Sequence, residues 1–246
     1  MTERQKTIYL VRHGQTESNA CGRLAGSTDQ PLTPLGLSQA KDLAAWFAWR
    51  LLPCPADDRS VSCPKSTMLC PKPTMLCLSS PLLRAKQTAR AVASLLGLEV
   101  EIDEDLAEMD FGVWEGRAVA EILAEDPHAF ERCWAPSDDT CFPGGESLGA
   151  FEERIRRALG RILACKEEIV LVFSHGGVVR AAACALLGLG REFMWRLKVE
   201  PATVLSCEIY GGNAILSGLW NISDCSVTAA ENLLVRGTGP AGNFAS

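Results

Sequence analysis

Two short apolar segments, far apart in the chain, each end in a histidine followed by glycine. Residues 7–11 (TIYLV) run into Arg12, His13 and Gly14, and residues 168–173 (EIVLVF) run into Ser174, His175, Gly176 and Gly177. Apolar runs of this length that end at glycine are typical of buried β-strands. The chain has only three histidines, and two of them share this context. The carboxyl ends of parallel strands meet at one edge of a sheet, so we expect both imidazoles to face one site there.

Helical patterns separate the predicted strands. Residues 34–52 are predicted to form a helix with Thr33 as its N-cap and Pro34 at its first position. A second helix is predicted to begin at Pro81, capped by Ser80, and to end near residue 96. Further strands are predicted at 74–79, 99–102, 203–210 and 214–221, and further helices at 147–166 and 176–187. Strands that alternate with helices predict a three-layer α/β/α fold around a mainly parallel sheet.

Composition and charge narrow the class of protein. The 246 residues are 47% hydrophobic with no linker between two cores, so we expect one domain over residues 1–246, as a monomer or homodimer. The net charge of −6 argues against binding nucleic acid or an anionic membrane through overall charge. Arg12 interrupts the first apolar run, and no stretch reaches the roughly 18 apolar residues of a membrane span. We therefore expect a cytoplasmic protein.

Residues 53–73 break the alternation of strands and helices. They are rich in proline and cysteine, and a seven-residue repeat begins there, CPKSTML (63–69) followed by CPKPTML (70–76). We interpret 53–73 as an inserted surface loop, remote from the site because it precedes a strand. The alternative is a metal or redox clip made by Cys54, Cys63, Cys70 and Cys77, but its spacing does not fit zinc pairs. Residues 224–246 are predicted to be a flexible tail.

Two arginines accompany the two histidines. Arg12 precedes His13, and Arg84 lies in the first turn of the predicted second helix. A cation is unfavourable in a first helical turn unless an anion compensates it, and a helix N-terminus itself favours anions. Arginine matches phosphate with a two-pronged guanidinium group. The residues therefore predict a phosphate site, whereas His128, in a polar helical stretch, is predicted to lie on the surface.

Six motifs in order carry a family resemblance. The first, LVRHGQTESN (10–19), is similar to L-x-R-H-G-x-T-x-x-N. The others are PLTPLG (31–36) with Gln39 and Ala40, SSPLLRAKQTA (79–89), LAEMDFGVWEG (106–116), PGGES (143–147) and VFSHGG (172–177). The set resembles the histidine phosphatase superfamily, in its phosphoglycerate-mutase-like branch with the R-H-G motif. The resemblance covers most of the chain.

The resemblance implies a phosphohistidine mechanism without a metal or other cofactor. His13 would be the nucleophile and Glu108 the proton donor. The phosphoryl oxygens would be held by Arg12, Asn19, Arg84 and His175. Arg12 and Arg84 also disfavour a charged His13 ring, which keeps the nucleophile neutral. The nearby acids are interpreted as structural or solvated, namely Glu104, Asp105, Asp110 and Glu115.

Three functions remain open on the sequence. A phosphatase acting on a small phosphorylated metabolite is favoured, because His175 follows Glu108 by 67 positions, an interval similar to the phosphatase branch. A cofactor-dependent phosphoglycerate mutase, which carries a longer insertion there, is the alternative. An inactive module that binds a phosphorylated ligand is disfavoured by the complete catalytic set. Residues 194–200 (MWRLKVE) resemble α-ribazole phosphatases of cobalamin assembly, so α-ribazole 5′-phosphate is one candidate substrate.

Overall fold

The computed structural model describes residues 6–52, 73–129 and 142–222. Its centre is a six-stranded sheet in the order β3-β2-β4-β1-β5-β6. The strands are β1 (Lys6–Arg12), β2 (Met75–Ser79), β3 (Val100–Ile102), β4 (Ile169–Ser174), β5 (Thr203–Tyr210) and β6 (Asn213–Asn221). β3, β2, β4 and β1 are parallel, and β5 and β6 form an antiparallel hairpin against β1. The predicted mainly parallel sheet is therefore confirmed.

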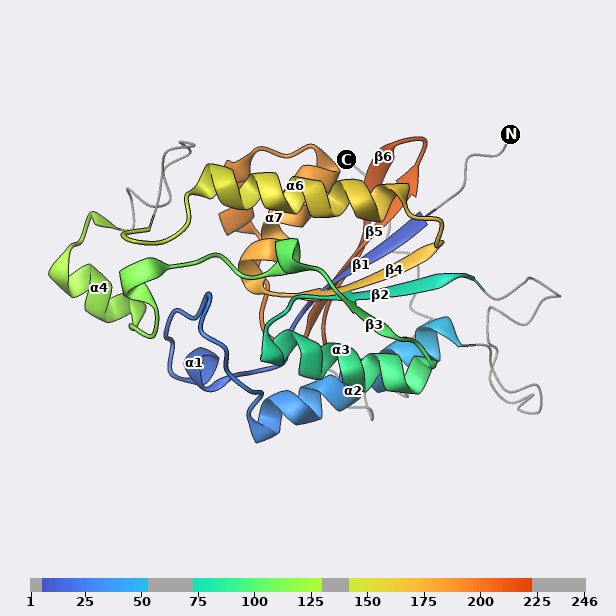
Figure 1. Cartoon of the computed structure of the whole chain (residues 1–246), viewed down its shortest axis with the longest axis horizontal. Coiled ribbons are helices and arrows are strands. Elements are labelled where there is room, and N and C mark those ends of the chain that lie inside the picture. The colour runs from blue at the N-terminus through green and yellow to red at the C-terminus, as the bar shows by residue number, and fades with distance from the viewer. Residues whose placement is uncertain (1–5, 53–72, 130–141, 223–246) are drawn as a thin grey trace, which may run out of the picture.

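Helices cover both faces of this sheet (Figure 1). On one face lie α2 (Pro34–Leu51) and α3 (Leu83–Leu96), and on the other lie α6 (Leu148–Ala164) and α7 (Gly176–Leu187). Successive residues of a strand point to opposite faces. Tyr9 and Val11 accordingly belong to one buried cluster, and Ile8 and Leu10 to the other. The alternation explains why β1 is apolar along its whole length, since both of its faces are buried.

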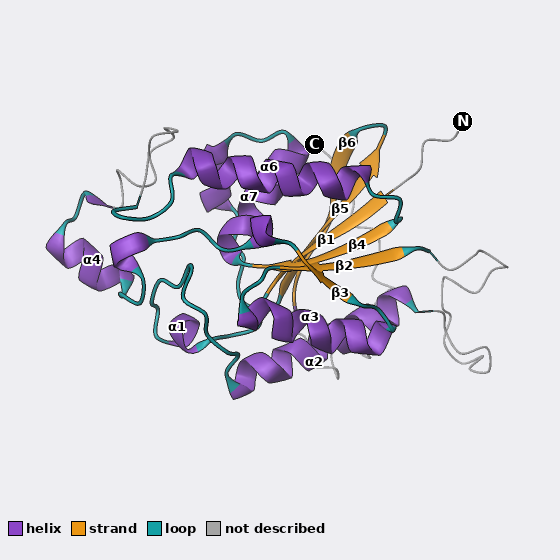
Figure 2. Ribbon diagram, viewed as in Figure 1, coloured by secondary structure: helices purple, strands orange, loops and turns teal. Residues whose placement is uncertain are grey.

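The short elements gather beyond the carboxyl ends of the parallel strands (Figure 2). They are α1 (Glu17–Ala20), α4 (Val119–Glu125) and the 3₁₀ helices η1 (Glu104–Leu106), η2 (Gly112–Trp114) and η3 (Arg191–Arg196). The register between β1 and β4 pairs Arg12 with Ser174, and the backbone N–H of His13 donates to the Ser174 carbonyl at 2.9 Å. The two histidines therefore leave adjacent strands at the same level.

The start of α3 corrects one prediction. The helix begins at Leu83 rather than Pro81, and Ser80 is not its N-cap residue, since Leu82 holds that position without a side-chain cap. The Ser80 hydroxyl instead accepts from the Leu82 N–H at 3.2 Å and meets His175 at 2.7 Å. At α2, by contrast, Thr33 accepts from the Gly36 N–H as predicted.

Two predicted segments lie largely or wholly outside the described residues, namely the 53–73 loop and the 224–246 tail. Of the four cysteines of the alternative clip, Cys77 is buried on β2. The other three, Cys54, Cys63 and Cys70, lie outside the described residues. Across residues 6–52, 73–129 and 142–222, no helix combines the length and hydropathy of a membrane span.

Candidate active site

The two histidine rings meet at the end of β1 and β4. Their centroids are 5.1 Å apart, and both side chains are buried, His13 at 3% and His175 at 0% exposure. Arg84 lies between them and is 1% exposed. Its Nε is 3.2 Å from Nε2 of His13 and 3.2 Å from Nδ1 of His175. The structure thus brings together three of the predicted site residues, from β1, α3 and the β4–α7 junction.

Hydrogen bonds fix which ring nitrogens carry a proton. Nδ1 of His13 is 2.6 Å from the Gly14 carbonyl, which can only accept, so Nδ1 is the donor. Nε2 of His13 therefore holds a lone pair, which faces the Nε–H of Arg84. His175 is the opposite tautomer, because its Nδ1 accepts from Arg84 and its Nε2 faces the Ser80 hydroxyl. The predicted nucleophile therefore carries its lone pair on Nε2.

The electrostatic surroundings keep both rings neutral. Burial, and then the charges of Arg12 and Arg84, hold the pKa of His13 well below its ordinary value. Burial and the charge of Arg84 act in the same direction on the pKa of His175. A neutral imidazole has the free lone pair that a nucleophile needs. Both rings are therefore neutral at neutral pH, which is the form that the predicted role of His13 requires.

Arg84 itself is held by a loop. Its Nη1 donates to the Thr28 carbonyl at 2.7 Å, and its Nη2 donates to the Gly26 carbonyl at 2.8 Å. The Glu115 carboxylate fixes this loop by accepting the N–H groups of Gly26, Ser27 and Thr28 at 2.9–3.3 Å. Arg84 thus positions both imidazoles, and its contact with a phosphoryl group stays a prediction. Glu115 is structural, as interpreted from the sequence.

Arg12 offers an unused donor. Its Nη1 donates to the Val199 carbonyl at 2.6 Å, whereas its Nε is buried and has no hydrogen-bond partner within the described part of the chain. Burial lowers the pKa of Arg12 to about 10, so the side chain stays charged at neutral pH. A buried donor without a partner is costly. A bound anion would remove that cost.

Glu108 reaches the site from the loop after η1. Its Oε2 accepts from the Gly177 N–H at 3.1 Å, and its Oε1 accepts from the Met109 N–H at 3.0 Å. The carboxylate therefore lies at the N-terminus of α7, where the helix dipole favours negative charge. A Cβ on residue 177 would lie 2.5 Å from Oε1 of Glu108. Glycine is needed here for the acid to approach.

Asn19 lies beside these groups but is partly engaged. Its Oδ1 accepts from the backbone N–H and the hydroxyl of Thr16, each at 3.0 Å, in the capping box of α1. The side-chain amide N–H groups are what it could offer a phosphoryl oxygen. Its phosphate-binding role stays a prediction.

A cavity of about 200 Å³ adjoins the site, with Arg12, Asn19, Glu108, Gly176 and Gly177 in its wall. The wall also contains Arg23 and Arg180, which the sequence analysis did not single out, and Trp195 from the segment 194–200. Arg180 stands one helical turn after Gly176, a spacing that could have indicated its position. Within the described ranges, no cluster of three or more His, Cys, Asp or Glu residues could hold a metal ion.

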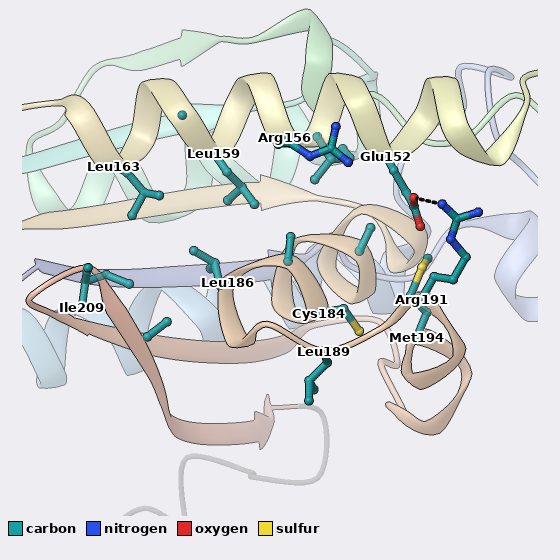
Figure 3. A pocket seen from close by; sticks show the side chains of 16 residues that line it. Glu152, Arg156, Leu159, Leu163, Cys184, Leu186, Leu189, Arg191, Met194 and Ile209 are labelled. Atoms are coloured by element: carbon teal, nitrogen blue, oxygen red, sulfur yellow. Dashed lines mark hydrogen bonds and ion pairs between the residues drawn. The ribbon is translucent and has the colours of Figure 1, made fainter. Parts of the chain in front are cut away.

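A larger groove of about 600 Å³ lies elsewhere, between α6, α7 and the β5–β6 hairpin (Figure 3). Its lining is mostly aliphatic, and an ion pair between Glu152 and Arg191 at 2.7 Å crosses one end. Neither histidine lines either space, but Arg12 and Gly176, the chain neighbours of the two histidines, line the smaller cavity and not this groove. The groove is larger, but the predicted site residues Arg12, Asn19 and Glu108 line the smaller cavity.

Comparison with known proteins identifies the family. The model of the histidine phosphatase superfamily, branch 1, matches residues 8–53 and 70–222. The chain belongs to this superfamily. It is 32% identical over 195 residues to the adenosylcobalamin/alpha-ribazole phosphatase of Escherichia coli, covering 78% of this chain and 85% of the relative. It is 30% identical over 197 residues to phosphoserine phosphatase 1 of Hydrogenobacter thermophilus, covering 80% and 83%.

Solved structures agree with this membership. The alpha-ribazole phosphatase from Shigella flexneri superposes with a TM-score of 0.69 at 30% identity, covering 87% of this chain and 96% of that one. A mycobacterial glucosyl-3-phosphoglycerate phosphatase gives 0.68 at 28% identity, covering 89% and 98%. The family, the predicted fold and the enzyme class are confirmed. This histidine phosphatase is therefore an enzyme of the phosphatase class.

Proposed function

We propose that this histidine phosphatase hydrolyses small phosphomonoesters through a phosphohistidine on His13, without a metal ion. The observation that carries the proposal is the neutral His13 ring, whose Nε2 lone pair lies beside the guanidinium of Arg84 at 3.2 Å. Arg12 adds a buried positive charge with an unused donor. These groups can stabilise the charge that develops on the phosphoryl oxygens. In phosphoryl-transfer enzymes that use metal ions, the metal supplies this stabilisation.

The first step forms a bond between Nε2 of His13 and phosphorus as the ester P–O bond breaks. Glu108, protonated, gives its proton to the leaving oxygen and becomes a carboxylate. The phosphorylated ring keeps its proton on Nδ1, and the Gly14 carbonyl at 2.6 Å stabilises the positive charge that the ring acquires. Gly14 therefore both selects the tautomer and supports the intermediate.

The second step reverses the roles. Glu108 takes a proton from water, the water oxygen bonds to phosphorus, and the P–N bond breaks. Inorganic phosphate leaves, His13 is again neutral, and Glu108 is again protonated. Between the two steps the carboxylate of Glu108 is held in place by the Gly177 N–H, which donates to its Oε2.

The substrate is supported less directly than the chemistry. α-Ribazole 5′-phosphate is a candidate because residues 194–200 resemble that branch and the Escherichia coli relative carries that name. Phosphoserine is a candidate through the Hydrogenobacter relative. The alternative is a phosphoglycerate mutase, in which the phosphoryl group returns to the substrate instead of passing to water, and a third option is a phosphate-binding module without turnover.

The test is phosphate release from a substrate panel in excess chelator, with His13→Ala alongside. The panel contains nitrophenyl phosphate, α-ribazole 5′-phosphate, phosphoserine and 3-phosphoglycerate. Metal-independent release that His13→Ala abolishes, together with acid-labile labelling of the wild-type protein alone, is the expected result. Isomerisation of 3-phosphoglycerate without release would establish the mutase. Substantial activity in His13→Ala would refute the nucleophile.

A further inference from the structure

Residues 143–147 (PGGES) form a motif for which the two histidines give no reason. In the structure this segment packs against the loop after η1, which carries Glu108. The Glu146 N–H donates to the Asp110 carbonyl at 3.0 Å, and a Cβ on Gly145 would lie 2.3 Å from that same oxygen. The motif therefore lies in direct contact with the loop of the predicted proton donor.

The side chain of Glu146 binds Arg154 of α6. The two form a two-pronged pair, in which Nε of Arg154 donates to Oε1 and Nη2 donates to Oε2, each at 2.8 Å. The Arg154 side chain is 12% exposed and that of Glu146 is 18% exposed. The guanidinium carbon also lies 4.7 Å from the centre of the Phe151 ring, which is fully buried. A carboxylate and an aromatic face together fix the plane of the guanidinium.

The remaining donors of Arg154 reach the loop of Glu108. Nη1 donates to the carbonyls of Asp105 at 2.8 Å and Ala107 at 2.5 Å, and Nη2 donates to the carbonyl of Glu108 at 3.0 Å. With the two bonds to Glu146, these bonds use all five N–H groups of a guanidinium. Arg154 therefore has no donor left for a phosphoryl group.

These bonds fix the direction in which the Glu108 side chain leaves the backbone. The carbonyls of Ala107 and Glu108 belong to the two peptide groups that meet at the Cα of Glu108. Peptide groups are planar, so holding both of them fixes the two backbone dihedrals of Glu108 and the direction of its Cα–Cβ bond. The carboxylate at the far end accepts from the N–H groups of Met109 at 3.0 Å and Gly177 at 3.1 Å. Arg154 therefore holds the backbone of Glu108 while α7 holds its carboxylate.

We propose that Arg154 and Glu146 are positioning residues for proton transfer, because they hold Glu108 where its carboxyl group reaches the leaving oxygen. This inference rests on the proposed function, in which Glu108 protonates that oxygen. General acid catalysis contributes about 10²–10⁴-fold, and a displacement of about 1 Å costs about 100-fold. Lysine has three donors on one nitrogen, so it keeps the charge of Arg154 but cannot hold the carboxylate and the three carbonyls together.

The experiment measures how hydrolysis depends on the leaving group. kcat/KM, which reports the steps up to release of the alcohol, is determined for nitrophenyl phosphate, phenyl phosphate and glycerol 3-phosphate, whose leaving groups are increasingly basic. Arg154→Lys is expected to slow glycerol 3-phosphate about tenfold and nitrophenyl phosphate less than about threefold, because only the basic leaving group needs the proton. Glu146→Gln is expected to show the same order with smaller effects. The inhibition constant of inorganic phosphate should change less than about threefold, because all five donors of Arg154 are committed elsewhere.

A double-mutant cycle distinguishes positioning from a general loss of structure. Glutamine at residue 108 has no carboxyl proton to give, so adding Arg154→Lys to Glu108→Gln should slow glycerol 3-phosphate less than about twofold further. Arg157→Gln is the matched control. Arg157 lies one turn further along α6 and pairs with the Asp105 side chain at 2.7 Å, so its loss should leave kcat/KM of all three esters unchanged.

The outcomes separate this inference from the phosphatase proposal. Equal slowing of the three esters by Arg154→Lys, or effects that multiply with those of Glu108→Gln, would overturn the positioning role and leave the phosphatase intact. Equal slowing in Glu108→Gln as well would overturn the acid assignment and this inference with it. Activity retained in His13→Ala would refute the proposed function whatever the dependence on leaving group. If Arg154→Lys shows no cooperative melt, the same cycle with Glu146→Gln decides the question.

Discussion

Replacing Glu115 with glutamine is expected to destabilise the protein and to lower its activity, although Glu115 touches neither histidine. Oε2 accepts from the Thr28 hydroxyl at 2.7 Å and from the Gly26 and Thr28 N–H groups at 3.0 and 3.3 Å, and Oε1 accepts from Gly26, Ser27 and Phe111. Glutamine retains one oxygen and turns an NH₂ group toward the other set of donors.

The magnitude follows from the hydrogen bonds that the substitution removes. A hydrogen bond to a charged group contributes about 1.5–3 kcal/mol, and the lower end applies because Glu115 is partly exposed. Removing one such bond, with weaker bonds at the remaining oxygen, gives about 2 kcal/mol, or a fall in Tm of about 4–8 °C. The freed loop carries the carbonyls that hold Arg84, so kcat/KM should fall about tenfold, equivalent to about 1.4 kcal/mol.

The pH dependence supplies an independent check. Burial alone would raise the pKa of Glu115, but the hydrogen bonds from Thr28, Ser27, Phe111 and Gly26 outweigh it and lower the pKa below its ordinary value of 4.5. A carboxyl whose pKa is lower in the folded state contributes stability above pH 4.5 and loses that contribution as pH falls through the folded pKa. The difference between wild type and Glu115→Gln should therefore shrink in acid.

The assay is denaturant unfolding of both proteins from pH 7 to pH 3, with kcat/KM for nitrophenyl phosphate at pH 7. Glu101→Gln, at an exposed position of β3, is the control and should change stability by less than about 0.5 kcal/mol. If Glu115→Gln behaved like this control in both measurements, the loop would not depend on Glu115 and Arg84 would not depend on the loop.

Three further predictions concern the acid, its approach to α7 and the two histidines. Glu108→Gln should slow alkyl phosphates about 100-fold and nitrophenyl phosphate far less, because only the poor leaving group needs the proton; equal slowing would exclude Glu108 as the acid. Gly177→Ala places a methyl 2.5 Å from Oε1 of Glu108 and should lower kcat for alkyl phosphates about tenfold. Gly160→Ala is the control, because a Cβ there meets nothing within 4 Å outside its own helix. It should leave kcat unchanged and stabilise α6 by about 1 kcal/mol. Burial first, then neighbouring arginines, lower the pKa values of His13 and His175, so below pH 6.5 the unfolded chain binds protons that the folded chain does not. The free energy of unfolding should thus be about 1.4 kcal/mol lower per ring at pH 5.5 than at pH 7.5, and a flat profile in denaturant melts would contradict neutral buried rings.

After the end of β2, the local sequence pattern predicted the wrong start for the helix α3. Ser80 precedes Pro81 in a sequence typical of a helix N-cap, yet the helix begins two residues later. Its hydroxyl is 2.7 Å from His175, which lies 95 residues further along the chain. A buried imidazole needs a hydrogen-bond partner, and that requirement prevailed over the local capping preference. The N-cap at Thr33 has no such competitor and was predicted correctly.

Some arginines of the site could be identified from the sequence and another could not. Arg12 and Arg84 were identified from their positions beside a strand end and in a first helical turn, and both lie at the site. Arg180 was not identified, because an arginine within a helix is ordinarily solvated and nothing local marks it. Its position in the cavity wall depends on the Leu197 carbonyl and on Trp195, which η3 brings against α7.

The sequence by itself determined the order of strands and helices, the parallel core, and the presence of two histidines at strand ends. Apolar runs, glycines and caps act over a few residues, so these features are legible locally. Only the tertiary structure decided that Arg84 holds the two rings rather than pointing freely at a ligand, that His13 is protonated on Nδ1, and that Glu108 meets the start of α7. The contacts of Arg84 and Glu108 depend on register and helix packing, which place groups 69 to 91 residues apart within hydrogen-bond distance, and no local pattern encodes such distances. The proton on Nδ1 of His13 depends on how the packed ring is turned toward the neighbouring Gly14 carbonyl.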